Sequence, residues 1–134
     1  EKMAVHSARK GYARDGMYGE RDKGRSMAIK YGDSALKTEV HPLARPHTET
    51  GRLALYVSPA YTIGIEGVAG DEALPILKEL YAHQAKPEYL YRHKWSQGML
   101  LMWDNRSVIH AATGGYEGHR RLLHRITVAD RTLQ

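Results

Sequence analysis

The sequence predicts a mainly β protein with a flanking helix, and two observations lead to this fold class. Apolar residues form short runs, or alternate with polar residues, in segments of strand length near 53–57, 89–95, 99–103, 106–111 and 120–128. One stretch, 71–85, instead repeats its apolar residues at helical spacing. The chain has 134 residues, the usual size of one domain. We therefore expect one mainly β domain with a single substantial helix.

The helix rests on the spacing of Leu74, Leu77 and Leu80 within 71–85. Pro75 interrupts this stretch, and proline is tolerated without cost only in the first turn of a helix. We therefore expect the helix to begin late, near Ala73, or to bend at the proline.

The last three expected strands bring basic side chains together. The run 99–103 leads through a polar corner at 104–106 into a strand that carries His110, and a glycine-bearing loop then leads into 120–128. We expect the side chains of Asp104 and Asn105 to satisfy local backbone groups at this corner. Because strand side chains alternate between faces, Arg121 and Arg125 share one face and His124 lies on the other. A hairpin centred on 114–117 would place His110 opposite Arg121, with Arg125 about 13 Å further at about 3.3 Å per residue.

An imidazole beside two fixed cations suits an anion held against a metal ion. The alternative is structural, because strand histidines are often satisfied in the core and strand arginines often extend to solvent. His93 belongs to an aromatic face of 89–95 and is either structural or part of a cavity wall. We assign five further histidines to structure or surface: His6, His41, His83, His119 and His124.

Several sequence motifs resemble those of one known family. Trp103-Asp104-Asn105-Arg106, His110 and the run 120–125 resemble the closing signature of the taurine dioxygenase and 2,4-dichlorophenoxyacetate dioxygenase (TauD/TfdA) family. The segments 41–47, 50–52 and 54–57 resemble the approach to a barrel strand in that family, and 89–95 with Gly98 resembles the strand and turn before the signature. The resemblance runs from about residue 39 to residue 129.

The resemblance implies a double-stranded β-helix of the jelly-roll, cupin-like type and an Fe(II)- and 2-oxoglutarate-dependent dioxygenase that uses O2. It implies that His110 is an iron ligand, that Arg121 binds 2-oxoglutarate, and that Arg125 binds 2-oxoglutarate or the acidic group of the substrate. Neutral imidazole suits Fe(II), and a guanidinium fork matches a carboxylate. The implied substrate is a small organic acid: a sulfonate, a sulfate ester or an aryloxy-carboxylate. Arg125 as a surface residue of the hairpin stays open.

The sequence departs from the family pattern at one point. The family's His-x-Asp pair, which supplies two iron ligands, is absent, and the most similar motif is His47-Thr48-Glu49 in a turn-like setting. We therefore expect 39–134 to be the C-terminal part of a dioxygenase barrel, incomplete as an iron site by itself. The alternative function is a non-catalytic barrel fragment, or an acid-binding relative that lacks a complete iron site.

The net charge of +5 arises largely before residue 31, in a glycine-rich stretch. We interpret 1–38 as a basic loop region or a lid, and we expect no nucleic-acid partner because zinc-finger and RRM-type words are missing. The chain has no cysteine, which excludes disulfides and a thiol nucleophile. We expect a cytoplasmic protein with no membrane segment, and the resemblance leaves a homodimer or homotetramer open.

Overall fold

The computed structural model describes residues 2–13, 15–16 and 31–129. Its main sheet is antiparallel in the order β2-β1-β5, with β1 at Met3–Ser7, β2 at Thr38–Pro42 and β5 at Thr62–Ile65. Ala4 pairs with His41 on one side and with Ile65 on the other. A second sheet is the antiparallel hairpin of β3, Ala44–Pro46, and β4, Leu53–Leu55. The strand expected at 53–57 is thus present as β4.

The central strand β1 lies in the region that the sequence assigned to a loop or lid. Ala4 is fully buried, and Ser7 donates a hydrogen bond from its hydroxyl to the Ala35 carbonyl at 2.9 Å. That carbonyl belongs to the short helix η1, Asp33–Leu36, and the short helix α1, Arg9–Tyr12, follows β1 directly. Residues 17–30 of the expected lid, which include Gly19 and Gly24, lie outside the described residues.

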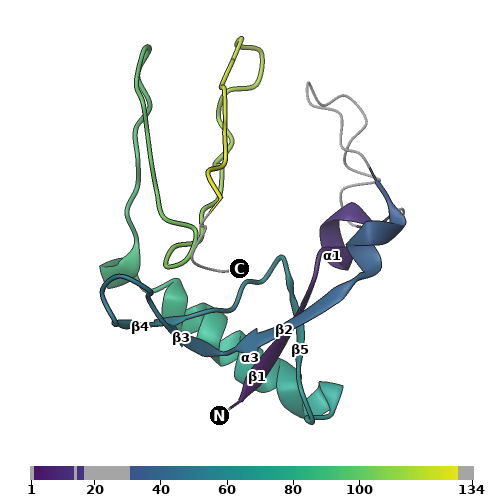
Figure 1. Ribbon diagram of the computed structural model, residues 1–134. Coiled ribbons are helices and arrows are strands. Elements are labelled where there is room, and N and C mark those ends of the chain that lie inside the picture. Colours follow the sequence, from purple (N-terminus) through teal and green to yellow (C-terminus); the bar gives the residue numbers. More distant parts are fainter. Residues whose placement is uncertain (1, 14, 17–30, 130–134) are drawn as a thin grey trace.

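The helix α3, Gly70–Gln84, packs against the main sheet, as the sequence predicted (Figure 1). The expected late start near Ala73 is wrong, because the helix begins at Gly70 and contains Pro75. The Ala69 carbonyl accepts hydrogen bonds from the amides of Glu72 and Ala73, so the first turn closes before the proline is reached. Pro75 then removes only one later hydrogen bond, to the carbonyl four residues earlier.

The core lies between α3 and the main sheet. Its buried members are Ala4, Val57, Ile65, Ala73 and Leu77. Ala73 and Leu77 are four residues apart, so they lie on the same face of α3 and point towards the sheet. Alanine at two of these five positions makes the core small. Among the described helices, none is both long and apolar enough to cross a membrane.

The C-terminal third of the chain differs from the expected strands. After the short helix η2, Pro87–Tyr89, residues 90–129 form two long extended excursions away from the sheets (Figure 1). The strands expected at 89–95, 99–103, 106–111 and 120–128 are wrong in this sense, since these segments join no sheet in the part of the chain that the structure describes. A strand needs hydrogen-bonding partners along its length. Leu100 and Ile126 are 84% and 90% exposed, so the apolar pattern is present without its burial.

Candidate functional site

The turn between β3 and β4 fixes the position of His47. The His47 amide donates to the Arg52 carbonyl at 2.9 Å, and the Gly51 amide donates to the His47 carbonyl at 2.8 Å. Gly51 has a φ of +68°, a left-handed conformation that glycine adopts without strain. The ring Nδ1 of His47 lies 3.3 Å from each of the amide nitrogens of Glu49 and Thr50, which donate to it. The turn thus holds the ring as well as the backbone.

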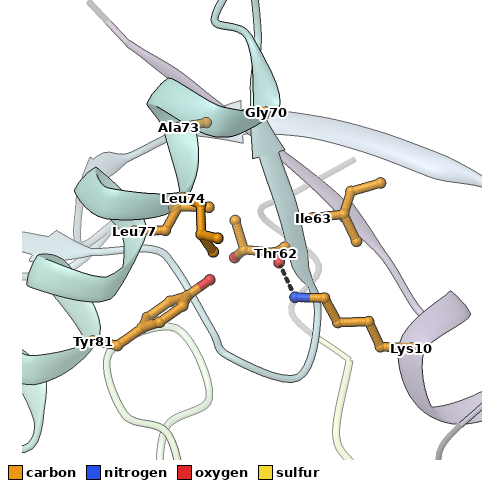
Figure 2. A pocket seen from close by; sticks show the side chains of 8 residues that line it. All are labelled: Lys10, Thr62, Ile63, Gly70, Ala73, Leu74, Leu77 and Tyr81. Atoms are coloured by element: carbon orange, nitrogen blue, oxygen red, sulfur yellow. Dashed lines mark hydrogen bonds between the residues drawn. The ribbon is translucent and has the colours of Figure 1, made fainter.

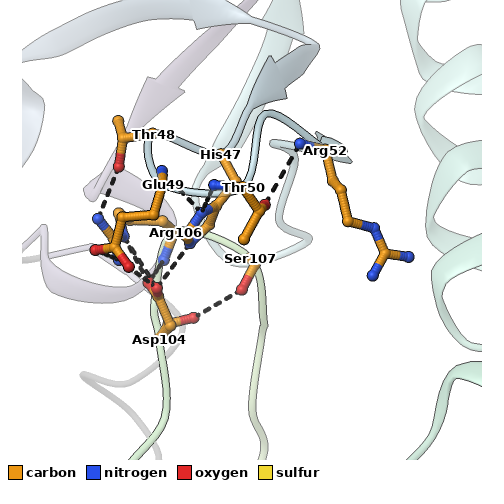
Figure 3. Close-up of polar contacts among 8 residues, drawn as sticks. All are labelled: His47, Thr48, Glu49, Thr50, Arg52, Asp104, Arg106 and Ser107. Atoms are coloured by element: carbon orange, nitrogen blue, oxygen red, sulfur yellow. Dashed lines mark hydrogen bonds and ion pairs between the residues drawn. The ribbon is translucent and has the colours of Figure 1, made fainter.

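The other ring nitrogen of His47 contacts Asp104 across 57 residues of sequence (Figure 3). His47 Nε2 lies 2.9 Å from Asp104 Oδ2, and the His47 side chain is only 12% exposed. Because Nδ1 accepts backbone hydrogen bonds, the proton of the neutral ring belongs on Nε2, where it is donated to the carboxylate. The turn therefore selects the tautomer that binds Asp104.

Arg106 completes this group of side chains. Its Nε lies 2.9 and 3.0 Å from the two carboxylate oxygens of Asp104, and one terminal nitrogen lies 2.6 Å from Oδ2. The same guanidinium reaches the β3–β4 turn, at 2.8 Å to the Thr48 hydroxyl and 3.1 Å to Glu49 Oε1 (Figure 3). These five residues, His47, Thr48, Glu49, Asp104 and Arg106, are called the corner cluster below.

The corner cluster keeps Asp104 ionised. Hydrogen bonds from the Arg106 side chain, then from His47, then from the Arg106 amide hold the pKa of the Asp104 carboxyl well below its usual range. The sequence predicted a local role for Asp104, and its Oδ1 does accept from the Arg106 amide at 2.8 Å. The contact between Asp104 and His47 was not predicted from the sequence.

His110 follows the corner closely. The Asp104 carbonyl accepts hydrogen bonds from the amides of Ser107 and Val108 at 3.2 and 3.1 Å, which forms a turn. The Trp103 indole donates from Nε1 to Asn105 Oδ1 at 2.8 Å. Its ring centroid lies 4.8 Å from that of His110, at an interplanar angle of 55°. The imidazole thus rests against an indole that the corner itself holds.

The two predicted anion-binding arginines lie on the second excursion. Arg121 places its guanidinium carbon 4.9 Å from the centroid of the Tyr116 ring. His110, Arg121, Arg125 and His124 are all exposed. A shared cavity for the first three, with His124 directed away from it, therefore stays a prediction.

Metal-binding capacity is incomplete within the chain segments that the structure describes. Among them, no three His, Cys, Asp or Glu side chains are grouped so that they could hold a metal ion. His47 and Glu49, the nearest word to the family's ligand pair, are instead engaged in the corner cluster, His47 with Asp104 and Glu49 with Arg106. The described residues therefore fit one candidate ligand, His110, and not a complete iron site.

A separate hollow of about 150 Å³ lies between α3 and β5 (Figure 2). Its wall includes Leu74, Leu77, Tyr81 and Ile63, and the Lys10 ammonium donates to the Thr62 carbonyl at 2.7 Å. None of the predicted site residues lines it. The hollow is mostly apolar, and its one ammonium group is bound to the backbone.

A second aromatic group joins the two sheets. The rings of His6, His41 and Tyr56 lie 5.4 to 5.6 Å apart, and the Arg45 guanidinium carbon lies 4.7 Å from the Tyr56 centroid. Burial first, then the nearby His41, lowers the pKa of His6, while Glu39 acts in the opposite direction. The structural role that the sequence gave to His6 and His41 agrees with this packing.

Comparisons with known proteins relate this arrangement to one family. The family model described as taurine catabolism dioxygenase TauD, TfdA family matches residues 3–127. The chain is 31% identical to pentalenolactone F synthase of Streptomyces arenae over 94% of its length and 45% of that protein. It is 39% identical to the alpha-ketoglutarate-dependent 2,4-dichlorophenoxyacetate dioxygenase of Cupriavidus pinatubonensis over 66% of its length and 31% of that protein. The chain thus spans less than half the length of these curated relatives.

A solved structure supports the same relation. It comes from Burkholderia xenovorans and is described as a candidate alpha-ketoglutarate-dependent 2,4-D dioxygenase. The similarity has a TM-score of 0.50 at 26% identity and covers 71% of this chain and 33% of that one. The expected fold class, mainly β with a flanking helix and of the jelly-roll type, is confirmed.

Proposed function

Because the chain belongs to the taurine catabolism dioxygenase TauD/TfdA family, we propose that the whole protein is an Fe(II)- and 2-oxoglutarate-dependent dioxygenase that hydroxylates a small organic acid. The observation that carries the proposal is the family match over residues 3–127, which includes the corner, His110 and both arginines. Relatives with related names add support, among them a 39% identical alpha-ketoglutarate-dependent dioxygenase.

His110 would provide one iron ligand. A neutral imidazole binds Fe(II) well, and a site of two histidines and one carboxylate leaves positions free for small molecules. The other two ligands would come from parts of the whole protein other than the described residues. When bound, iron and 2-oxoglutarate supply the oxidising chemistry, while the protein binds and orients the reactants.

Arg121 would hold the distal carboxylate of 2-oxoglutarate. A guanidinium donates two parallel hydrogen bonds to a carboxylate, an arrangement that fixes its orientation. Tyr116 already limits the freedom of this side chain by lying against its guanidinium. Arg125 would hold a second acid group, either on 2-oxoglutarate or on the substrate.

We propose a sulfonate, sulfate ester or aryloxy-carboxylate as the substrate. Two relatives have names of this kind: the 2,4-dichlorophenoxyacetate dioxygenase, and a fission yeast protein named as a sulfonate dioxygenase, which is 40% identical over 66% of this chain. An arginine at position 125 suits an anionic group in each of these substrates. We place the protein in the cytoplasm, where 2-oxoglutarate and small organic acids would be its partners.

The proposal is tested in the whole protein by separating the roles of the site residues. His110→Ala should abolish turnover and sharply weaken iron binding, because two remaining ligands hold Fe(II) weakly. His124→Ala is the matched control, a histidine on the same segment that should leave both properties unchanged. Iron content, turnover and the apparent KM for 2-oxoglutarate are measured for each variant. Equal iron binding by the two histidine variants would refute the assignment of His110.

Arg121→Ala should leave iron bound and raise the apparent KM for 2-oxoglutarate. Removing one partner of an enclosed charge pair costs about 2–5 kcal/mol, so the rise should be about 30-fold or more. Arg125→Ala should raise the KM of the prime substrate if Arg125 binds that acid, or of 2-oxoglutarate if it assists Arg121. A wild-type whole protein without iron or 2-oxoglutarate binding would favour the alternative, a non-catalytic acid-binding relative.

A further inference from the structure

The corner cluster has the contacts of a structural clamp rather than of a ligand site. Both ring nitrogens of His47 are engaged, one by backbone amides of its own turn and the other by Asp104. Both carboxylate oxygens of Asp104 accept from Arg106, whose guanidinium also bonds to Thr48 and Glu49. These groups satisfy one another, and together they join the β3–β4 turn to residues 57 positions later.

The clamp acts on the segment that carries His110. Asp104 binds the cluster through its side chain, while its carbonyl closes the turn to Ser107 and Val108. Its neighbour Trp103 is held by the Asn105 side chain and lies 4.8 Å, between ring centroids, from His110. A movement of the corner would therefore move the indole and with it the surface on which the imidazole rests.

We propose that His47, Asp104 and Arg106 are positioning residues that hold the corner against the β3–β4 turn, so that Trp103 sets the orientation of the His110 imidazole. Naming His110 as an iron ligand rests on the proposed function; the positional relation itself does not. Groups that orient metal-binding histidines typically change metal affinity 10–100-fold when they are removed. His47, 63 residues before His110 in the sequence, would thus affect the iron site without touching it.

The orientation of His110 is measured by NMR of its ring protons in the metal-free chain of 134 residues, at one pH for all variants. An indole whose ring centroid lies 4.8 Å away displaces the resonances of the neighbouring imidazole, and His110→Gln assigns those resonances by their loss. We expect the displacement to vanish in Trp103→Ala and to decrease in His47→Ala and in Asp104→Ala. His47→Gln should restore much of it, because its amide nitrogen can still donate to Asp104.

Two controls accompany these variants. Glu39→Gln removes a second histidine–carboxylate contact, His41 to Glu39 at 3.5 Å, and should leave His110 unchanged. The His93 and Trp95 rings, 5.1 Å apart on the first excursion, form an internal reference that the clamp variants should not alter. An unchanged His110 displacement in both His47→Ala and Asp104→Ala would overturn the proposal. If an alanine variant fails to fold by far-UV circular dichroism, the amide variants decide. An equal displacement of the His110 resonances in His47→Gln and Glu39→Gln, together with a smaller displacement in Asp104→Asn, supports the clamp. A displacement that Asp104→Asn does not lower overturns it.

Iron affinity separates this inference from the proposed function. In the whole protein, Asp104→Ala and His47→Ala should weaken Fe(II) binding about tenfold, with a smaller effect on the KM for 2-oxoglutarate. A wild-type protein that does not bind Fe(II) would refute the proposed function, while the NMR result would still decide whether the clamp positions His110. Normal iron affinity in both variants, with iron bound by the wild type, would refute the clamp's effect on the iron site.

Discussion

Leu77 connects α3 to the main sheet, and its replacement by alanine should strongly destabilise the chain. The side chain is only 4% exposed and belongs to the buried core cluster. Leucine-to-alanine changes in cores cost about 2–5 kcal/mol, and the cost increases with the volume of the cavity left behind. Because Leu77 also borders the hollow beside α3, solvent can partly fill the vacated space. We therefore expect the lower part of that range, about 2–3 kcal/mol.

Leu74→Ala is the matched control, since Leu74 lies one turn earlier on the same helix and is 51% exposed. Its replacement should cost less than about 1 kcal/mol, because little apolar surface is lost from the interior. Urea titration followed by far-UV circular dichroism measures both variants. With an m-value of about 1–3 kcal/mol/M, the Leu77→Ala midpoint should fall by about 0.7–3 M. Equal midpoints for the two variants would refute the packing of α3 on the sheet through Leu77.

Two further predictions concern pH and backbone conformation. The pKa of His6 is lowered in the folded chain, so stability should be full above the unfolded value of 6.5 and should fall as the pH drops below it, by at most about 1.4 kcal/mol per pH unit. The urea midpoints measured at pH 7.5 and at pH 5.5 should therefore differ in the wild type and lie closer together in His6→Gln. Asp104 does not contribute to this difference, because its lowered pKa affects stability only at more acidic pH. Gly51→Ala should destabilise by about 1–2 kcal/mol, since a Cβ meets no atom there within 4 Å and only the positive φ opposes it. Gly64→Ala, with equal space and no positive φ, should be close to neutral, and a Gly51→Ala midpoint as high as that of Gly64→Ala would contradict this reasoning.

Local sequence patterns predicted α3 and the polar corner, because the information for both lies within a few residues. The spacing of Leu74, Leu77 and Leu80 defined the helix, and only its start was misplaced, by the weight given to Pro75. Asp104 was expected to satisfy a nearby backbone group, and it accepts from the Arg106 amide. Features of this kind follow from residue type and short-range geometry.

The corner cluster was not predictable in the same way. His47 belongs to the motif nearest to the family's metal-ligand pair, yet the partner of its side chain is a carboxylate 57 residues away. No periodic pattern reports a contact at that separation. The sequence does contain one indication, because Asp104 and His47 both belong to motifs that resemble the family. That resemblance indicates membership of the family, however, and not a contact between the two residues. The β1 strand was missed for a related reason: five residues, Met3–Ser7, give too short a pattern beside the basic stretch that follows them.

The expected strands of the C-terminal third show the limit of pattern most clearly. Alternation is present as predicted: Tyr91, His93 and Trp95 lie on one face, with ring centroids 5.8 and 5.1 Å apart in sequence order. A period of two, however, specifies only which face of an extended segment is apolar, and pairing depends on a second segment whose backbone accepts and donates in register. The described residues supply no such partner for 90–129, so the segment keeps its extended form and exposes its apolar face. His110, Arg121 and Arg125 all lie on this part of the chain. Their convergence into one site therefore depends on what pairs with these excursions, and the corner cluster fixes the base from which His110 would enter that site.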